Sequence, residues 1–260
     1  MSSRSPAAVL AFAASDPTGG AGIQADLLTI AALGCHPLSV ITALTVQDTQ
    51  GVERLLPIEA QWITAQAERL LADIPVAAFK AGVLGSAQNV RAVSDVVSQH
   101  GAVPFVVDPV LASGRGDSLA HDEAIEALRE LILPQATILT PNSLEARRLA
   151  GAMDLGECAR RLIDQGCEYV LITGTHEAGV DVVNSLYDAS GMVREDRWPR
   201  LPASYHGSGC TLASAIAAEL AKGLEPAEAA QAAQRFTWES LAAGFKPGGG
   251  QHVPNRFFRS

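Results

Sequence analysis

The chain has 260 residues, of which 48% are hydrophobic, and a formal net charge of −9. This length and composition predict a single domain, residues 1–260, with a substantial core. The acidic balance and the lack of a basic stripe exclude a nucleic-acid backbone as partner, and no apolar run is long enough for a membrane span.

The four cysteines, Cys35, Cys158, Cys167 and Cys210, show no CxxC spacing. They also lack the density of a small disulfide scaffold, so we expect neither a zinc site nor disulfides. Reduced thiols in a cytoplasmic protein fit this pattern best.

Strand-like apolar runs alternate with helix-like segments as far as Gly174. The first run follows Arg4 as in a short signal peptide, but the turn residues "SDPTGGAG" come directly after it and favour a buried strand. The predicted strands are Val9–Ala14, Ser39–Thr45, Ala77–Val83, Phe105–Val110, Thr137–Thr140 and Tyr169–Thr173. The predicted helices are Ile23–Leu33, Glu59–Leu71, Ala87–Gln99, Asp122–Leu131, Ser143–Ala150 and Gly156–Asp164. This order predicts an α/β fold with a parallel sheet covered on both faces.

After Gly174 the pattern changes. Val182–Asp188 and Met192–Trp198, joined by "ASG", are predicted as a hairpin that adds antiparallel strands to the sheet edge. Two helices, Thr211–Lys222 and Pro226–Ala243, and a loop-like tail complete the chain. No internal repeat or domain boundary is visible.

The segments that follow the predicted strands are polar or glycine-rich, which is typical of ligand sites in open α/β sheets. They include "SDPTGGAGIQAD", "TVQDTQG", "GVLGS", "DPVLASGRGD", "TPNSLE" and "TGTH". Neither a P-loop, GxxxxGK[ST], nor a GxGxxG turn after the first strand is present.

The segment "HGSGCT", His206 to Thr211, leads directly into an alanine-rich helical pattern. Its glycines permit a tight turn, and the first turn of the helix offers unpaired N–H groups and a partial positive charge. We therefore predict a phosphate-binding loop. Cys210 would have a lowered pKa there, suited to a base or hydrogen-bond donor. The alternative is an ordinary glycine turn with a packing thiol.

Several segments in the same order resemble the hydroxymethylpyrimidine/phosphomethylpyrimidine kinase family of the ribokinase-like superfamily. They are "SDPTGGAGIQADLLTIAALGCHPLSVITALTVQDTQGV", "KAGVLGS", "VVDPVL", "TPNSLEA" and "YHGSGCTLASAIAAELA". The resemblance implies a three-layer αβα fold with a central, mostly parallel sheet, no separate lid domain and a homodimer. It also implies that ATP, with Mg²⁺, phosphorylates the pyrimidine hydroxymethyl group and then the monophosphate.

The resemblance also assigns candidate site residues. Cys210 and the N–H groups of Gly207, Ser208 and Gly209 match the family's anion hole, with the cysteine helping to deprotonate the hydroxyl. Expected substrate contacts are Asp26, Gln47, Gly20, Ala21, Val83 and Val110; expected nucleotide contacts are Asn142, Thr173, Gly174 and His206. Asp108 and Glu145 are the candidate Mg²⁺ ligands.

Some of these positions have simpler interpretations. Glu145, three residues after Asn142, also fits a capping box at a helix start. Gln47 can simply solvate a loop, and Asp26 can be a helix-surface acid. Those alternatives stay open at this stage.

The chain departs from the family pattern at three places. Thr173 in "LITGTH" stands where the family often has a lysine near the nucleotide phosphates, and a hydroxyl cannot supply an ammonium's charge. Arg115 in "SGRGD", or Mg²⁺ alone, would have to compensate. Ala14 stands where glycine is common, and Val83 replaces a frequent methionine. Two other functions therefore stay in view: a pyridoxal kinase, and a pyrimidine-binding regulatory protein without turnover.

Overall fold

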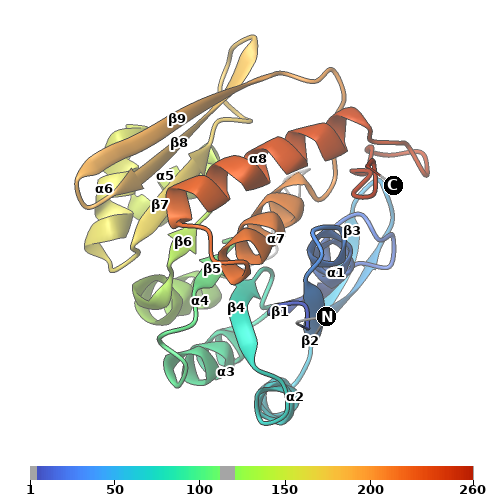
Figure 1. Cartoon of the computed structure of the whole chain (residues 1–260), viewed down its shortest axis with the longest axis vertical. Helices are drawn as coiled ribbons and strands as arrows, with labels where there is room; N and C mark the ends of the chain where they lie inside the picture. Colours follow the sequence, from blue (N-terminus) through green and yellow to red (C-terminus); the bar gives the residue numbers. More distant parts are fainter. Residues whose placement is uncertain (1–4, 112–120, 260) are drawn as a thin grey trace.

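The computed structural model describes residues 5–111 and 121–259, so Arg115 lies outside the described residues. Within these ranges one nine-stranded sheet runs in the order β3-β2-β1-β4-β5-β6-β7-β8-β9 (Figure 1). Its parallel part comprises β1 (Ala8–Ser15), β2 (His36–Gln47), β4 (Val76–Ala81), β5 (Phe105–Val107), β6 (Ile138–Leu139) and β7 (Tyr169–Thr173). The predicted mostly parallel sheet is therefore confirmed.

The predicted edge hairpin is also confirmed, as β8 (Asp181–Asp188) and β9 (Gly191–Pro199), both antiparallel. The opposite edge differs from the prediction. There β3 (Val52–Pro57) pairs antiparallel with β2, in a segment for which we predicted no strand. Half or more of the β3 side chains are exposed, so "VERLLP" lacks the apolar run by which buried strands are recognised. We call the pair β2–β3 the ribbon.

Helices cover both faces of the sheet (Figure 1). One layer contains α2 (Ala60–Leu71), α3 (Ala87–Ser98), α4 (Asp122–Ala127), α5 (Ser143–Ala150) and α6 (Leu155–Asp164); the other contains α1 (Gly22–Ala32), α7 (Ser208–Ala221) and α8 (Pro226–Ala242). The predicted helix at 122–131 is shorter than expected, because a π-helical turn, Leu128–Ile132, and a 3₁₀ turn, Leu133–Gln135, follow α4. The three-layer αβα arrangement agrees with the prediction.

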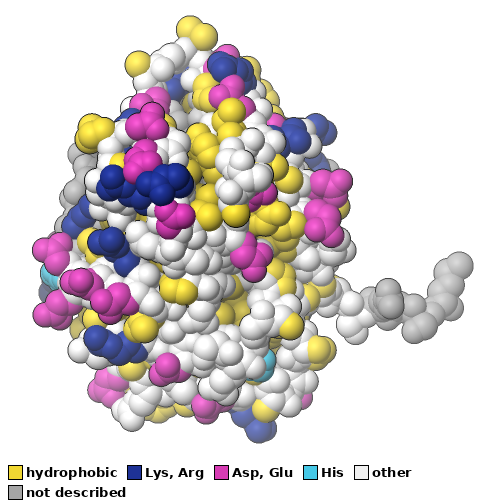
Figure 2. Space-filling view, turned by 90° about the vertical axis from the view of Figure 1, so that its left-hand side faces the viewer, with side chains coloured by type: hydrophobic (Ala, Val, Ile, Leu, Met, Phe, Trp, Pro, Cys, Tyr) yellow, Lys and Arg dark blue, Asp and Glu magenta, His cyan; other side chains and the backbone are white. Residues whose placement is uncertain are grey.

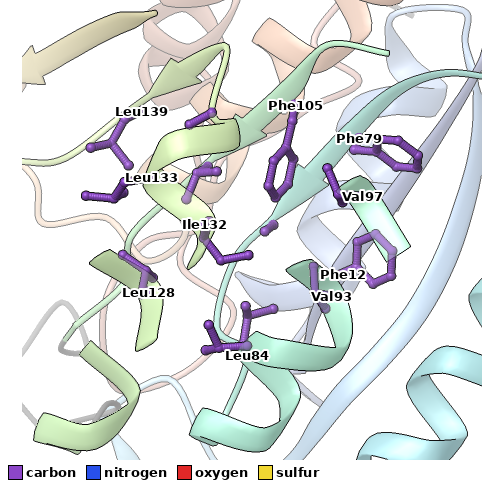
Figure 3. Close-up of a cluster of buried hydrophobic side chains, with 14 of the residues drawn as sticks. Phe12, Phe79, Leu84, Val93, Val97, Phe105, Leu128, Ile132, Leu133 and Leu139 are labelled. Carbon is purple, nitrogen blue, oxygen red and sulfur yellow. The ribbon is translucent and has the colours of Figure 1, made fainter. Parts of the chain in front are cut away.

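Side chains of the parallel strands point alternately to the two faces of the sheet, and each face packs a separate hydrophobic core. On β1, Leu10 and Phe12 face one core, while Val9 and Ala11 face the other. Figure 3 shows the first core, in which Phe12 lies near Phe79 and other large side chains fill the space between sheet and helices. Because both faces of β1 are covered, its sequence is a continuous apolar run.

The exposed surface carries charges of both signs. On the face shown in Figure 2, Lys and Arg side chains are interspersed with Asp and Glu and form no basic stripe. None of the helices in residues 5–111 and 121–259 has the length and apolar character needed to cross a membrane.

Candidate active site

A cavity of about 800 Å³ lies at the carboxyl ends of the parallel strands. Ligands in open α/β sheets bind at this edge, and the volume is in the range of small-molecule sites. The ribbon lines one end of the cavity and β9 with α8 lines the other. The N-terminus of α7 also lines the cavity, together with residues at the ends of the central strands. The cavity is therefore large enough to hold two reactants, one on each side of α7.

Helix α7 presents its first turn to this cavity. Gly207 is its N-cap with φ +81°, and a Cβ there would overlap the Gly20 carbonyl oxygen, so only glycine fits. Thr211 Oγ1 donates to the Gly207 carbonyl oxygen at 2.8 Å. Ser208, Gly209 and the preceding glycine all line the cavity, and the unpaired N–H groups and partial positive charge of a 14-residue helix start suit an anion. The predicted phosphate-binding loop thus faces open space.

Asp16, which the sequence analysis did not select, organises the facing loop. Its carboxylate accepts hydrogen bonds from the Thr18 and Ala21 N–H groups and lies 2.8 Å from His206 Nε2. Burial raises the pKa of Asp16, but these hydrogen bonds, that of His206 first, lower it below its usual value. His206 lines the cavity, and its ring contacts Asp16. This contact connects the loop before α7 with the loop after β1.

A buried ion pair lies beneath the site. Lys80 Nζ, on β4, lies 2.8 and 3.0 Å from the two carboxylate oxygens of Asp26 on α1, and both residues are fully buried. Ser214 Oγ on α7 also donates to Asp26. Burial lowers the pKa of Lys80, but the Asp26 charge more than offsets this and raises it above its usual value. A Cβ at Gly82 would come within 2.7 Å of Lys80 Nζ, so a side chain there would displace the ammonium group.

This pair corrects the expected contact between Asp26 and the pyrimidine. Asp26 is 0% exposed, is not among the cavity-lining residues and gives its carboxylate to Lys80 and Ser214. Nor does it lie on the helix surface, which was the alternative. The missed residue is Lys80, which does line the cavity.

We expect Lys80→Met to lower the free energy of unfolding by about 3 kcal/mol, because it leaves the Asp26 carboxylate buried without a counter-charge. Urea unfolding followed by circular dichroism measures this loss. The matched double variant, Lys80→Met with Asp26→Asn, removes both charges and should recover most of the stability. A double variant as unstable as the single one would contradict this account.

Asp108 and Cys210 meet at the start of α7. Asp108, directly after β5, is 5% exposed, and its Oδ2 has no hydrogen-bond partner. The carboxylate accepts from the Cys210 thiol and would lie 3.5 Å from a Cβ at Gly209. Burial raises the pKa of Asp108 to about 6, although the Lys80 charge opposes the shift.

The expected lowered pKa of Cys210 is wrong. Burial among protein atoms raises the pKa of the thiol to about 12, despite the opposing charge of Lys80 and a hydrogen bond from the Gly22 N–H. The thiol is therefore protonated at neutral pH. Of the two expected roles, hydrogen-bond donation fits this thiol and a preformed thiolate base does not.

Glu145 forms the capping box that was its alternative interpretation. The Asn142 side chain accepts from the Leu144 and Glu145 N–H groups, and Glu145 Oε2 accepts from the Asn142 N–H at 2.9 Å. Glu145 Oε1 accepts from the Leu111 N–H at 3.3 Å. Burial first, and then the charge of Asp108, raise the pKa of Glu145 to about 8.

Asp108 and Glu145 nevertheless fit a Mg²⁺ site shared with a nucleotide. Both line the cavity, the charge of Asp108 contributes to the raised pKa of Glu145, and the Asp108 Oδ2 lacks a partner inside the protein. Among the described residues no cluster of three or more His, Cys, Asp or Glu side chains is arranged to hold a metal ion. Mg²⁺ usually keeps several waters and takes only one or two carboxylates beside phosphate oxygens, so two suffice.

The ribbon end of the cavity combines apolar side chains with an amide. Four residues for which we predicted substrate contacts line the cavity: Gln47, the last residue of β2, and Ala21, Val83 and Val110. Gly20 does not line it; a Cβ there would meet the His206 ring at 2.6 Å, so this glycine permits close packing of two loops.

Toward the other end, Asn142 and Thr173, for which we predicted nucleotide contacts, line the cavity. Gly174 does not: its N–H donates to Asn184 Oδ1, and a Cβ there would lie 2.2 Å from the Val183 carbonyl oxygen. The close approach of Gly174 to β8 requires a glycine. Gly174 therefore shapes the protein next to the cavity and does not contact a ligand in it.

Comparison with known proteins agrees with this geometry. Residues 16–255 match the family model described as phosphomethylpyrimidine kinase. The chain is 43% identical to the hydroxymethylpyrimidine/phosphomethylpyrimidine kinase of Streptomyces coelicolor, over 94% of this chain and 92% of the relative. It is similar to the crystal structure of an ADP complex of Bacillus subtilis pyridoxal kinase, with a TM-score of 0.90, 30% identity and coverage of 97% and 98%. It is also similar to the phosphomethylpyrimidine kinase structure from Clostridium difficile, with a TM-score of 0.79, 33% identity and coverage of 90% and 99%.

Proposed function

The chain belongs to the phosphomethylpyrimidine kinase family, and we propose that this kinase of thiamine biosynthesis performs two phosphorylations with ATP and Mg²⁺. The first is on the hydroxymethyl group of 4-amino-5-hydroxymethyl-2-methylpyrimidine and the second on its monophosphate. The observation that carries the proposal is the start of α7, which lines the cavity together with Asp108, whose Oδ2 has no hydrogen-bond partner.

Each group of the site has a task in such a transfer. The N–H groups of Gly207, Ser208 and Gly209 would hold the phosphoryl oxygens, where negative charge is spread in the transition state. Asp108 and Glu145 would hold Mg²⁺, which neutralises charge on the nucleotide oxygens when bound.

The acceptor hydroxyl needs positioning more than early ionisation. In a loose phosphoryl-transfer transition state, bond formation to the nucleophile lags behind departure of the leaving group. The Cys210 thiol, which stays protonated and hydrogen-bonds to Asp108, is placed to orient that hydroxyl beside the α7 N-terminus. This role replaces the expected deprotonation by a low-pKa thiol.

The ribbon end would bind the pyrimidine. The Gln47 amide offers both a donor and an acceptor to the amino group and ring nitrogens. Ala21, Val83 and Val110 supply apolar walls for the ring.

The decisive experiment is ADP release by the purified protein with Mg²⁺ and ATP. Four acceptors are compared: the hydroxymethylpyrimidine, its monophosphate, pyridoxal and ribose. Turnover with the first two supports both phosphorylations and shows that Thr173 can replace the usual lysine. Turnover with the first alone would overturn the second step.

A pyridoxal kinase is the second candidate, favoured by one observation. The backbone superposes closely on the pyridoxal kinase of Bacillus subtilis, with a TM-score of 0.90. Release of ADP with pyridoxal alone would establish that function instead. Binding of the pyrimidine without any ADP release would indicate the regulatory protein.

We further propose a cytoplasmic homodimer in which a second copy covers the outer face of the ribbon. The register pairs Leu44 with Leu56, and these two side chains and Val46 are exposed apolar groups. Light scattering should give a mass of twice 27.1 kDa, and Leu56→Arg should shift it to that of one chain. A monomeric wild type would contradict the dimer.

A further inference from the structure

The segment that follows α8 carries a buried arginine. The chain turns back after α8 (Figure 1), and Val253 and Phe245 exchange two backbone hydrogen bonds. The Asn255 N–H then donates to the Ser240 carbonyl oxygen at 2.9 Å. These contacts fix the backbone next to Arg256, whose side chain points into the protein and is 5% exposed.

Arg256 hydrogen-bonds to both loops that meet at the site. Its Nε donates to Thr211 Oγ1 at 3.1 Å, and its Nη2 and Nη1 donate to the carbonyl oxygens of Gly20 and Gly19 at 2.6 and 3.4 Å. Thr211 Oγ1 in turn donates to the carbonyl oxygen of Gly207, the N-cap of α7. One guanidinium group therefore connects the loop after β1 with the helix start that lines the cavity.

The charge of Arg256 has no counter-charge in contact with it. All three of its acceptors are neutral oxygens, and within residues 5–111 and 121–259 it forms no ion pair. Asp26 is paired with Lys80. Burial lowers the pKa of Arg256, although Cys210 and then Asp26 oppose the shift. An arginine nevertheless stays protonated, and a buried charge without a partner destabilises a protein unless another group compensates it.

The other cations near the site are differently placed. Among the described lining residues, Lys and Arg side chains occur at two, Lys80 and Arg200. The Lys80 charge is offset by Asp26, and Arg200 is exposed, where water and salt screen its charge. Thr173, at the position where the family often has a lysine, is neutral. Arg256 is therefore the buried cation of this region whose charge remains available to an anion.

We propose that Arg256 is a positioning residue for the transferred phosphoryl group. Its charge makes the start of α7 more positive, and its hydrogen bonds hold that start against the loop after β1. The inference rests on the proposed binding of phosphoryl oxygens at the start of α7. Arg256 does not line the cavity, so it acts through Thr211 and Gly207. Within a protein a fixed charge acts over several ångströms, and a bound anion would compensate the buried guanidinium in return.

Two substitutions separate the charge from the hydrogen bonds. Arg256→Gln removes the charge and keeps an amide that can donate to the Gly20 carbonyl oxygen. We expect it to raise the Kd for tripolyphosphate with Mg²⁺ about tenfold, the size of one charge interaction across a few ångströms of protein. Arg256→Lys keeps the charge with a less suitable set of donors, and its Kd should stay within about threefold of the wild type. Calorimetry gives these constants, and circular dichroism shows whether each variant is folded.

Steady-state ADP release gives a second measurement. In Arg256→Gln we expect kcat to fall about tenfold while the KM for the hydroxymethylpyrimidine changes by less than about threefold, because the affected charge stabilises the phosphoryl group and not the ring. Arg256→Lys should recover most of kcat. Arg259→Gln is the matched control, since Arg259 lies in the same tail, pairs with Glu239 and has a side chain that is 62% exposed. It changes the net charge equally and should behave as the wild type.

A purely structural arginine would give other results. A folded Arg256→Gln protein with the tripolyphosphate Kd of the wild type would overturn the inference. So would a folded Arg256→Lys protein that loses as much anion affinity as Arg256→Gln, and this second variant decides the question if Arg256→Gln does not fold. If the wild type releases ADP while either result holds, the role of Arg256 fails and the kinase function stands. If the wild type neither binds tripolyphosphate nor releases ADP, both fail.

Discussion

The Cys210→Ala protein is expected to phosphorylate the hydroxymethylpyrimidine about 10²-fold more slowly than the wild type, the order of magnitude for losing a group that positions the acceptor hydroxyl. The thiol is the one side chain of the α7 first turn that hydrogen-bonds to Asp108 in the described site. Its removal leaves the backbone N–H groups intact, so we expect the KM for ATP to change by less than about threefold. Steady-state ADP release at varied ATP measures both constants.

Cys210→Ser is the matched control for that variant. A serine hydroxyl also donates and stays protonated at neutral pH, so it should retain more activity than alanine does. If a thiolate base were essential, serine would be as inactive as alanine. Near-normal turnover of a folded Cys210→Ala protein would show that the thiol only packs.

The Asp108→Asn protein is expected to lose about 10²-fold or more in kcat and to require a higher Mg²⁺ concentration, because a charged metal ligand worth several kcal/mol at the transferring phosphoryl group is removed. The amide keeps the size of the side chain and can still hydrogen-bond to Cys210. Titration of the ADP-release rate with Mg²⁺ at saturating ATP measures the shift. Asp73→Asn, an exposed carboxylate just after α2, is the control and should titrate as the wild type. An unchanged Mg²⁺ titration would remove Asp108 from the metal site.

The Asp108→Asn substitution should also change how the stability of the folded protein depends on pH. The folded-state pKa values of Asp108 and Glu145, about 6 and about 8, lie above their ordinary values, so the folded protein binds more protons than the unfolded one. These two groups therefore make stability fall as pH rises from about 4 to about 8. With ATP present, Mg²⁺ should raise the melting temperature more at pH 8 than at pH 5, since it binds the ionised carboxylates. This gain should shrink in Asp108→Asn; an equal gain at both pH values would contradict the assignment.

Much of the fold was predictable because its signals are local. The buried run at β1 predicts a strand covered on both faces, and the apolar spacing on α3 predicts its helix. The strand β3 escaped prediction, because a strand at the sheet edge with most side chains exposed has no apolar pattern. Its existence depends on pairing with β2.

The sequence by itself determined the parts of the site that a few adjacent residues create. The loop "HGSGCT" contains Gly207, whose left-handed conformation at the N-cap favours glycine, and the first residues of the helix, which line the cavity. Asn142 and Glu145, three residues apart, likewise form a capping box within one helical turn. Both features depend only on residues that are close in the sequence.

Only the tertiary structure decided which charges are buried and with whom. Lys80 and Asp26 are 54 residues apart, and His206 and Asp16 are 190 residues apart, so no local pattern joins them. The sequence suggested a lowered pKa for Cys210, whereas burial in the assembled site raises it. Desolvation and the charges of distant neighbours set such pKa values, and both exist only after the chain has folded.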